Sequence, residues 1–76
     1  MPKSAAPIPF AARLRQLREQ AGLGVAELAE RAGLARAAVY HYESGIREPA
    51  WDPLCRLADA LGVSLDAFRR VSRSRA

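Results

Sequence analysis

Apolar residues recur at the three- and four-residue spacing of amphipathic helices from residue 10 onward. The first run ends at Gly22, and its apolar positions are Phe10, Leu14, Leu17 and Ala21. The second run ends at Gly33, and its apolar positions are Val25, Leu28, Ala29 and Ala32. Because glycine readily adopts the left-handed conformation in which many helices end, the pattern predicts one helix before Gly22 and a short second helix before Gly33.

A third helix is predicted from Arg36 to Glu43, closed by Ser44 and Gly45. On a helical wheel, one side of this segment holds Ala38, Val39 and Tyr42. The opposite side holds Arg36, Ala37, Tyr40 and His41. The first side is expected to pack on the protein, which leaves the second side for solvent or a binding partner. Residues 46–50 are expected to form a loop.

The remaining pattern predicts two more helices. The fourth ends before Gly62, with Asp52 as its expected cap and Pro53 at the first helical position. Its apolar stripe consists of Trp51, Leu54, Cys55, Ala58 and Leu61. Trp51 is therefore expected in the core, with a subunit interface as the alternative. The fifth helix follows Ser64 as its cap, and its apolar residues are Leu65, Phe68 and Val71.

These elements predict one all-α domain over residues 10–71. Residues 1–9 contain three prolines, which remove backbone donors and disfavour helix, so an irregular N-terminal arm is expected. Residues 72–76 have nothing to bury and are expected to form a basic C-terminal tail. The composition agrees with one small helical domain, because the 76-residue chain is 50% hydrophobic but only 7% aromatic.

The net charge of +4 is concentrated at the two ends of the chain. Residues 10–68 contain seven arginines against eight acidic residues, a net charge of −1. The positive surplus comes from Lys3, Arg69, Arg70, Arg73 and Arg75. These residues could be arms that follow DNA phosphates or simply solvated tails, and the composition does not separate the two.

Candidate catalytic and metal-binding residues are sparse. Cys55 is the single cysteine, which excludes an intramolecular disulfide and a multi-cysteine metal site, and its helical spacing favours a core thiol. His41 has no histidine, cysteine or carboxylate beside it on its exposed face. The sequence therefore predicts no enzymatic activity, no cofactor, no metal and no small-molecule substrate. No segment is apolar enough for a signal core or a membrane span, which favours a cytoplasmic protein.

The second and third helices form the most specific pattern. Two short helices joined at Gly33, the second with an exposed polar face, suit the DNA major groove, which admits one helix. Ala29 allows the two helices to approach closely, and Gly33 adopts a conformation that a side chain would strain. Residues 25–44 resemble the helix-turn-helix of the phage-repressor-like family, which includes xenobiotic-response-type regulators. The resemblance continues through residues 17–23, 42–45, 47–49 and 57–65.

The resemblance implies a five-helix bundle in which the third helix recognises DNA. The positions that reach base edges in this family are Arg36, Ala37, Tyr40 and His41. The positions that contact the DNA backbone are Gly24, Val25, Ser44 and Arg47. The resemblance also implies an ion pair between Arg18 and Glu43, which has an architectural role, as do Ala29 and Gly33.

Three positions depart from the family pattern. Val25 replaces the usual glutamine that opens the second helix, Ala35 replaces a serine or threonine cap, and Ile46 replaces a lysine. Direct readout of bases would therefore depend on Arg36 and two aromatic residues, so specificity is expected to be modest or to depend on DNA shape.

The sequence thus predicts a DNA-binding transcriptional repressor or regulator that acts as a symmetric homodimer on two half-sites of double-stranded DNA. The alternative is a protein-interaction module of the same fold, such as an antitoxin or a regulatory subunit. The alanine-rich exposed face and the slightly acidic central region favour this alternative.

Overall fold

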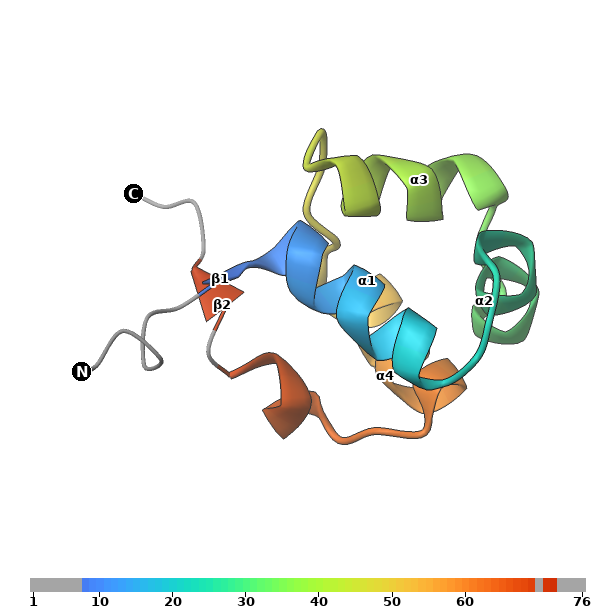
Figure 1. The fold of residues 1–76 in the computed structure, drawn as a ribbon. Coiled ribbons are helices and arrows are strands. Elements are labelled where there is room, and N and C mark those ends of the chain that lie inside the picture. Colours follow the sequence, from blue (N-terminus) through green and yellow to red (C-terminus); the bar gives the residue numbers. More distant parts are fainter. Residues whose placement is uncertain (1–7, 70, 73–76) are drawn as a thin grey trace.

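The computed structural model describes residues 8–69 and 71–72 and is built almost entirely of helices (Figure 1). Its α-helices are α1 (Phe10–Gln20), α2 (Val25–Ala32), α3 (Arg36–Ser44) and α4 (Trp51–Leu61). A short 3₁₀ helix, η2, covers Leu65–Phe68. Two strands of two residues each, β1 (Ile8–Pro9) and β2 (Val71–Ser72), lie at the two ends of the described chain.

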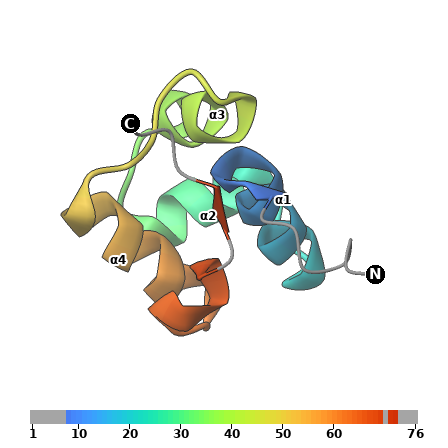
Figure 2. The same cartoon turned by 90° about the vertical axis from the view of Figure 1, so that its left-hand side faces the viewer.

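The helices enclose one hydrophobic core. Helix α1 packs against α3, and α2 packs against both α3 and α4, as the two perpendicular views show (Figures 1 and 2). The largest fully buried side chains come one from each helix, namely Leu14, Leu28, Val39 and Leu57. Each of these residues lies on the apolar stripe of its own helix, so four amphipathic helices bury their stripes against one another.

The predicted positions of the first four helices and their glycine stops are confirmed. Helices α2, α3 and α4 end at glycines in the left-handed conformation, Gly33, Gly45 and Gly62. The five-helix count is not confirmed, because the last predicted helix is the single 3₁₀ turn η2 followed by β2. Ser64 precedes that turn but makes no side-chain capping bond.

Helix α4 begins two residues earlier than predicted, at Trp51 rather than at Pro53. Its cap is Ala50, so Asp52 and Pro53 both lie in the first turn. Proline is compatible with the whole first turn, where backbone N–H groups have no intrahelical acceptor. The Asp52 carboxylate instead accepts a 2.9 Å hydrogen bond from Nε of Arg56, one turn along the helix. The prediction that Asp52 caps this helix was therefore wrong.

The predicted core position of Trp51 was also wrong, because this residue is 68% exposed. The buried face of α4 is formed by Leu54, Leu57, Ala58 and Leu61. On a helical wheel Trp51 lies about 70° from the centre of that face. Cys55 is only partly buried for the same reason. Ala21, assigned to the first apolar stripe, is likewise exposed, because α1 ends before it.

The first and last described residues pair with each other on one side of the molecule. Strands β1 and β2 are parallel, with Ile8 opposite Val71 and Pro9 opposite Ser72. The rings of Phe10 and Phe68 stack with centroids 5.3 Å apart, and Nε of Arg13 donates a 2.8 Å hydrogen bond to the Ala67 carbonyl. The last two residues of the predicted irregular arm are therefore ordered by pairing with the end of the domain.

The rest of the predicted arm, residues 1–7, lies outside the described residues, as do residues 73–76 of the predicted tail. Lys3, Arg70, Arg73 and Arg75 belong to this group. Within the described part of the chain, no helix combines the length and apolar character that a membrane crossing requires.

Candidate nucleic-acid interface

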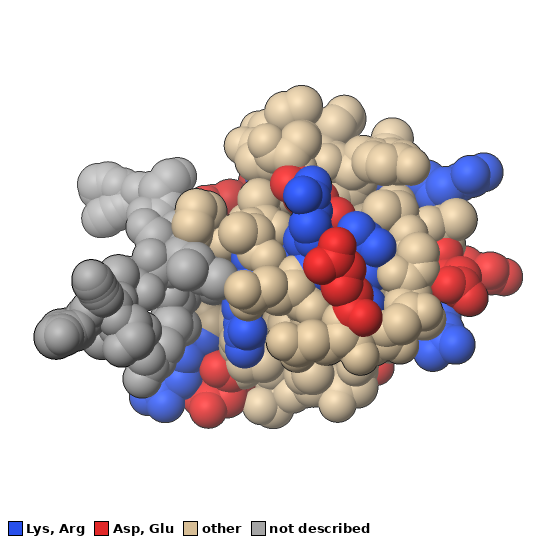
Figure 3. Space-filling view, viewed as in Figure 1, with Lys and Arg blue, Asp and Glu red and all other residues tan. Residues whose placement is uncertain are grey.

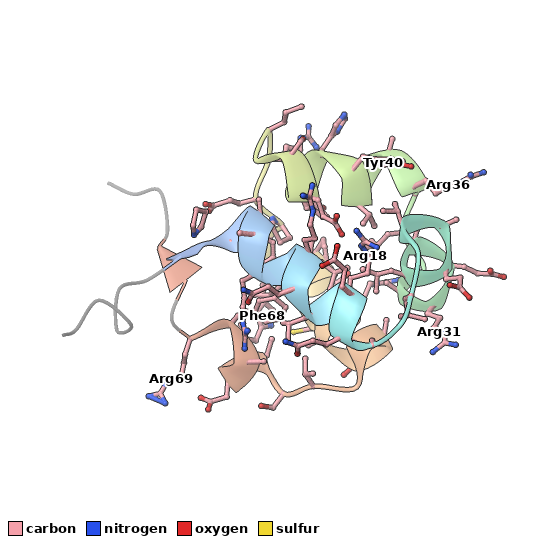
Figure 4. All side chains as sticks on the ribbon, viewed as in Figure 1. Arg18, Arg31, Arg36, Tyr40, Phe68 and Arg69 are labelled. Atoms are coloured by element: carbon pink, nitrogen blue, oxygen red, sulfur yellow. The ribbon has the colours of Figure 1, made fainter. Side chains whose placement is uncertain are left out.

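Helix α3 has one face in the core and one face in solvent. Val39, Tyr42 and Glu43 are buried, and Ala38 is partly buried. The face predicted to contact bases is exposed along its whole length, since all of its members are accessible: Arg36, Ala37, Tyr40 and His41. Figure 4 shows Arg36 pointing away from the body at one end of α3, with Tyr40 further along the same helix. The structure thus brings these four residues together on one outer edge.

The turn before α3 sets the angle at which this helix leaves α2. Gly33 has a φ of 70°, and the amide of Leu34 donates a 2.9 Å hydrogen bond to the Ala29 carbonyl. A Cβ atom on Gly33 would lie 3.0 Å from Nη1 of Arg56, so the turn is restricted both by its conformation and by α4. Ala29 is only 2% exposed, which leaves no room for a larger side chain where the helices meet.

The inner side of α3 is joined to α1 by a bidentate ion pair. Arg18 donates from Nε to Oε2 of Glu43 at 2.6 Å and from Nη2 to Oε1 at 3.0 Å. Its Nη1 donates to the Leu23 carbonyl at 2.9 Å. The side chains of Arg18 and Glu43 are only 14% and 5% exposed. This is the pair that the family resemblance implies, and it connects α1, the α1–α2 loop and the C-terminal half of α3.

The hydrogen bond with Glu43 raises the pKa of the Arg18 guanidinium above its ordinary value, and the charge of Glu43 acts in the same direction. Arginine is already protonated at physiological pH, so a raised pKa keeps the cation, and hence its contribution to stability, intact throughout that range. The protonation of Arg18 therefore does not make this ion pair pH-dependent in the physiological range.

Arg15 is a neighbour of this pair that the sequence reasoning missed. Its Nε lies 3.7 Å from Oε1 of Glu43, and its side chain is 59% exposed. The spacing of three residues from Arg18 places both cations on one side of α1, which is the feature of the sequence that could have identified it. Because Arg15 is exposed and more distant, it contributes much less than Arg18.

The outer edge of α3 carries little charge. In the view of Figure 3, the surface over α3 is mostly uncharged, with arginine at one end and both arginine and acidic side chains on the face below it. Arg36 is the one residue with a fixed charge among the four predicted base contacts. Figure 4 also shows Arg31 beside α2, pointing away from the protein and away from α3.

The predicted backbone contacts lie near the two ends of α3 (Figure 1). Gly24 and Val25 open α2, which lies beside the N-terminal end of α3. Ser44 is the last residue of α3, and Arg47 lies in the loop that follows it. Ser44 Oγ donates to the His41 carbonyl at 3.3 Å, and the amide of Arg47 donates to the same carbonyl at 3.3 Å. The exposed side chain of Arg47 can therefore reach outward while its backbone closes the helix.

Glu27 was not identified from the sequence, although it lies beside one of these predicted contacts. The amide of Gly24 donates a 3.0 Å hydrogen bond to Oε1 of Glu27, which caps the start of α2. A phosphate approaching Gly24 would meet this carboxylate. A glutamate three residues after the cap position is the sequence feature that predicts such a bond.

Within the described residues, no group of three or more histidine, cysteine or acidic side chains is arranged to hold a metal ion. The exposed face of α3 offers hydrogen-bond donors, one guanidinium and aromatic surface. Such a face can recognise a surface with acceptors and negative charge.

The structure and sequence match known helix-turn-helix proteins. A family model described as a helix-turn-helix domain matches residues 9–71. The restriction-modification controller protein C.AhdI from Aeromonas hydrophila has 36% sequence identity and a TM-score of 0.75, with 78% of this chain and 89% of that chain covered. The P22 c2 repressor in complex with a synthetic operator has 27% identity and a TM-score of 0.73, with 79% and 91% covered.

Among curated sequences, the uncharacterized HTH-type transcriptional regulator YqaE of Bacillus subtilis is 37% identical over 57 residues, which are 75% of this chain. The chain spans 49% of YqaE and 16% of a second relative, a protein of Methanocaldococcus jannaschii named as an HTH-type transcriptional regulatory protein. The family model covers most of the chain, and the same all-helical fold occurs in the P22 c2 repressor. This chain therefore belongs to the helix-turn-helix domain family, in its phage-repressor-like form.

Proposed function

We propose that this chain binds double-stranded DNA as a transcriptional regulator and inserts α3 into the major groove. The observation that supports this most directly is the outer face of α3, where Arg36, Tyr40 and His41 are exposed together while the inner face is held in the core. A single helix with a polar outer face fits the width of the major groove. The P22 c2 repressor, which has the same fold, has been solved in complex with a synthetic operator.

Arg36 is the main candidate for reading a base. It lies in the first turn of α3 and extends away from the protein (Figure 4). A guanidinium in this position can donate two parallel hydrogen bonds to O6 and N7 of guanine. Tyr40 and His41 can add polar and apolar contacts on the same side, and Ala37 allows the backbone of α3 to approach the bases closely.

Contacts to the DNA backbone would hold α3 in register. We assign them to the residues that open α2, Gly24 and Val25, to Ser44 at the C-terminal end of α3, and to Arg47 in the loop that follows. First-turn amides lack intrahelical acceptors and the helix dipole favours an anion there. The Glu27 carboxylate beside Gly24 opposes such an anion, so Arg47 is expected to contribute more than the start of α2.

Regulation would follow from occupancy of an operator by two copies of the chain on two half-sites, with repression as the expected outcome. One recognition helix buries too little DNA for strong specificity, which is why a homodimer is proposed. The chain would act in the cytoplasm, without a cofactor and without enzymatic activity of its own.

The test is selection of bound duplexes from a randomised DNA pool with the intact chain, followed by affinity measurements on the enriched duplex. Enrichment of one sequence that contains two related half-sites is expected. Substitution Tyr40→Ala should then lower affinity for that duplex without changing the thermal midpoint, because Tyr40 is 59% exposed. Absence of any enriched sequence, together with capture of a partner protein, would favour an interaction module of the antitoxin or regulatory-subunit type.

A further inference from the structure

One exposed arginine beside α3, Arg15 of α1, is not among the proposed DNA contacts. Its side chain is 59% exposed, and its Nε lies 3.7 Å from Oε1 of Glu43. Charge-assisted hydrogen bonds between these groups are about 2.7–2.9 Å long, so the approach to Glu43 is loose. The guanidinium of Arg15 is therefore available to bind another anion.

Glu43 does not depend on Arg15, because Arg18 already donates to both of its carboxylate oxygens. The two hydrogen bonds from Arg18 are 2.6 and 3.0 Å long, and the Glu43 side chain is only 5% exposed. The buried carboxylate thus stays paired when Arg15 turns toward another partner, and little stability is lost. An anion that approaches Arg15 also meets no unpaired charge on Glu43.

Arg15 lies on the side of α3 that also holds the start of α2. Nη1 of Arg18 donates to the Leu23 carbonyl at 2.9 Å, one residue before Gly24. Arg15 precedes Arg18 by three residues and so belongs to the same side of α1. Helix α1 lies one layer behind the outer face of α3 (Figures 1 and 2). From this layer a long side chain can reach the rim of the groove that α3 enters, but not the base edges.

We propose that Arg15 binds a phosphate of the DNA backbone from α1, at the edge of the major groove that α3 enters. This inference rests on the proposed DNA-binding function. A guanidinium suits this task, because its planar donors match two phosphate oxygens, and such contacts fix register without reading sequence. On this side of α3 the assigned contacts Gly24 and Val25 are uncharged, and the Glu27 carboxylate opposes a phosphate at Gly24. Arg15 supplies positive charge there.

The charges around Arg15 balance one another. After the hydrogen bond and the charge of Glu43, the charge of Glu19 also raises the pKa of Arg18, so Glu19 belongs to this neighbourhood. Glu19 is exposed and lies one turn after Arg15 on α1. Two arginines are thus matched by two glutamates. The contact therefore depends on Arg15 touching a phosphate rather than on long-range attraction, and the loss of another exposed arginine should not reproduce its effect.

The salt dependence of DNA binding tests this contact. Each phosphate that a protein neutralises on duplex DNA contributes about 0.9 to the slope of log K against log salt. Arg15→Ala should reduce the slope by about this amount, and it should weaken binding to the duplex enriched from the randomised pool and to random DNA equally. Arg15→Lys should keep most of the slope, because it keeps the charge. The thermal midpoint of both variants should stay close to that of wild type.

Arg69→Ala is the matched control. Arg69 is 70% exposed, has a carboxylate neighbour at 3.4 Å in Asp66, and points away from α3 (Figure 4). Its loss removes the same charge from the molecule and should leave the slope unchanged. Equal reductions in Arg15→Ala and Arg69→Ala would show that only net charge matters, which would overturn the proposal, as would an unchanged slope in Arg15→Ala. A loss confined to the enriched duplex would make Arg15 a base contact and would also overturn it.

A double-mutant cycle then identifies the phosphate. The enriched duplex is prepared with one phosphate at a time replaced by a neutral methylphosphonate, and each version is measured with the wild-type chain and with Arg15→Ala. At one phosphate of each half-site the two losses should be non-additive, because both changes remove the same contact. Additive losses at every phosphate would overturn the Arg15 contact alone. Failure of the wild-type chain to bind any duplex would overturn the proposed function and this contact with it.

Discussion

The two faces of α3 differ in what restrains their side chains. On the inner face, Glu43 is held by two hydrogen bonds from Arg18, and Val39 is completely buried. On the outer face, Arg36, Tyr40 and His41 extend into solvent. Both faces belong to the same nine-residue helix.

The inner face is therefore fixed by the packing of the fold, whereas the outer face makes no such contacts and, in the proposed function, contacts DNA. A substitution on the inner face should change the free energy of unfolding, because it leaves a buried group without its partner or opens a cavity. A substitution on the outer face should change DNA binding and leave stability within about 0.5 kcal/mol of wild type.

The largest expected effect is on the inner face. Arg18→Ala should lower the free energy of unfolding by about 3–5 kcal/mol, because it leaves the Glu43 carboxylate buried without its bidentate partner. Arg15 recovers only part of this loss, since it is 3.7 Å away and mostly exposed. Urea denaturation followed by circular dichroism measures the loss.

The control for this prediction replaces both partners. Arg18→Met combined with Glu43→Leu should recover most of the stability, because no buried charge remains. DNA affinity per folded molecule should change little in either variant. A fully stable Arg18→Ala variant that no longer binds DNA would contradict the assignment of Arg18 to the inner face.

The next effect is on the outer face. Arg36→Ala should reduce discrimination at one base pair of each half-site by about 1–3 kcal/mol, and affinity for random DNA should hardly change. Arg31→Ala is the matched control, because Arg31 is exposed on α2 and points away from α3 (Figure 4). An equal loss on selected and random DNA would place Arg36 on a phosphate, and no loss on either would move recognition away from α3.

Alanine substitutions at two glycines test whether the backbone of the turn before α3 also helps to position the inner face. Gly33→Ala and Gly62→Ala should each cost about 1–2 kcal/mol of stability, because both glycines have positive φ values of 70° and 73°. The added Cβ meets Nη1 of Arg56 at 3.0 Å in the first case and nothing within 4 Å in the second.

Any excess cost of Gly33→Ala over Gly62→Ala should stay below about 1 kcal/mol, because Arg56 is half exposed and can move away from its surface pair with Asp52. Thermal unfolding of both variants measures this difference. Adding Arg56→Ala to Gly33→Ala should remove the excess, and an excess that persists would locate the conflict in the backbone.

The smallest effect concerns the start of α2. Glu27→Gln keeps an acceptor for the Gly24 amide but removes a negative charge, so DNA affinity at low salt should rise while stability falls by about 0.3–1 kcal/mol. The gain should disappear at high salt. Glu30→Gln is the control on the same helix. Equal gains in the two variants would show that only net charge matters and that Gly24 is not near a phosphate.

Much of the fold could be predicted from the sequence because the information is local. The spacing of apolar residues located α1 to α4, and the glycines located their ends. The same periodicity separated Val39 and Tyr42 from Arg36 and His41 on opposite sides of α3. The candidate site was predictable for the same reason, since all four proposed base contacts lie on one helix.

Other features depend on contacts between residues far apart in the sequence. The exposure of Trp51 follows from how α4 is rotated toward α2, and the pairing of Ile8 with Val71 follows from the meeting of the two chain ends. The shortening of the fifth helix to η2 accompanies the stacking of Phe68 on Phe10 and the bond from Arg13 to Ala67.

The sequence by itself determined where the four α-helices lie and which side of α3 is polar, because helical periodicity depends only on residues within a few positions of one another. The tertiary structure decided that Ile46, after α3, and Trp51, at the start of α4, are exposed, and that Arg15 joins the Arg18–Glu43 pair. It also decided that β1 pairs with β2. These outcomes depend on how the helices pack and rotate against each other, which a helical wheel does not contain.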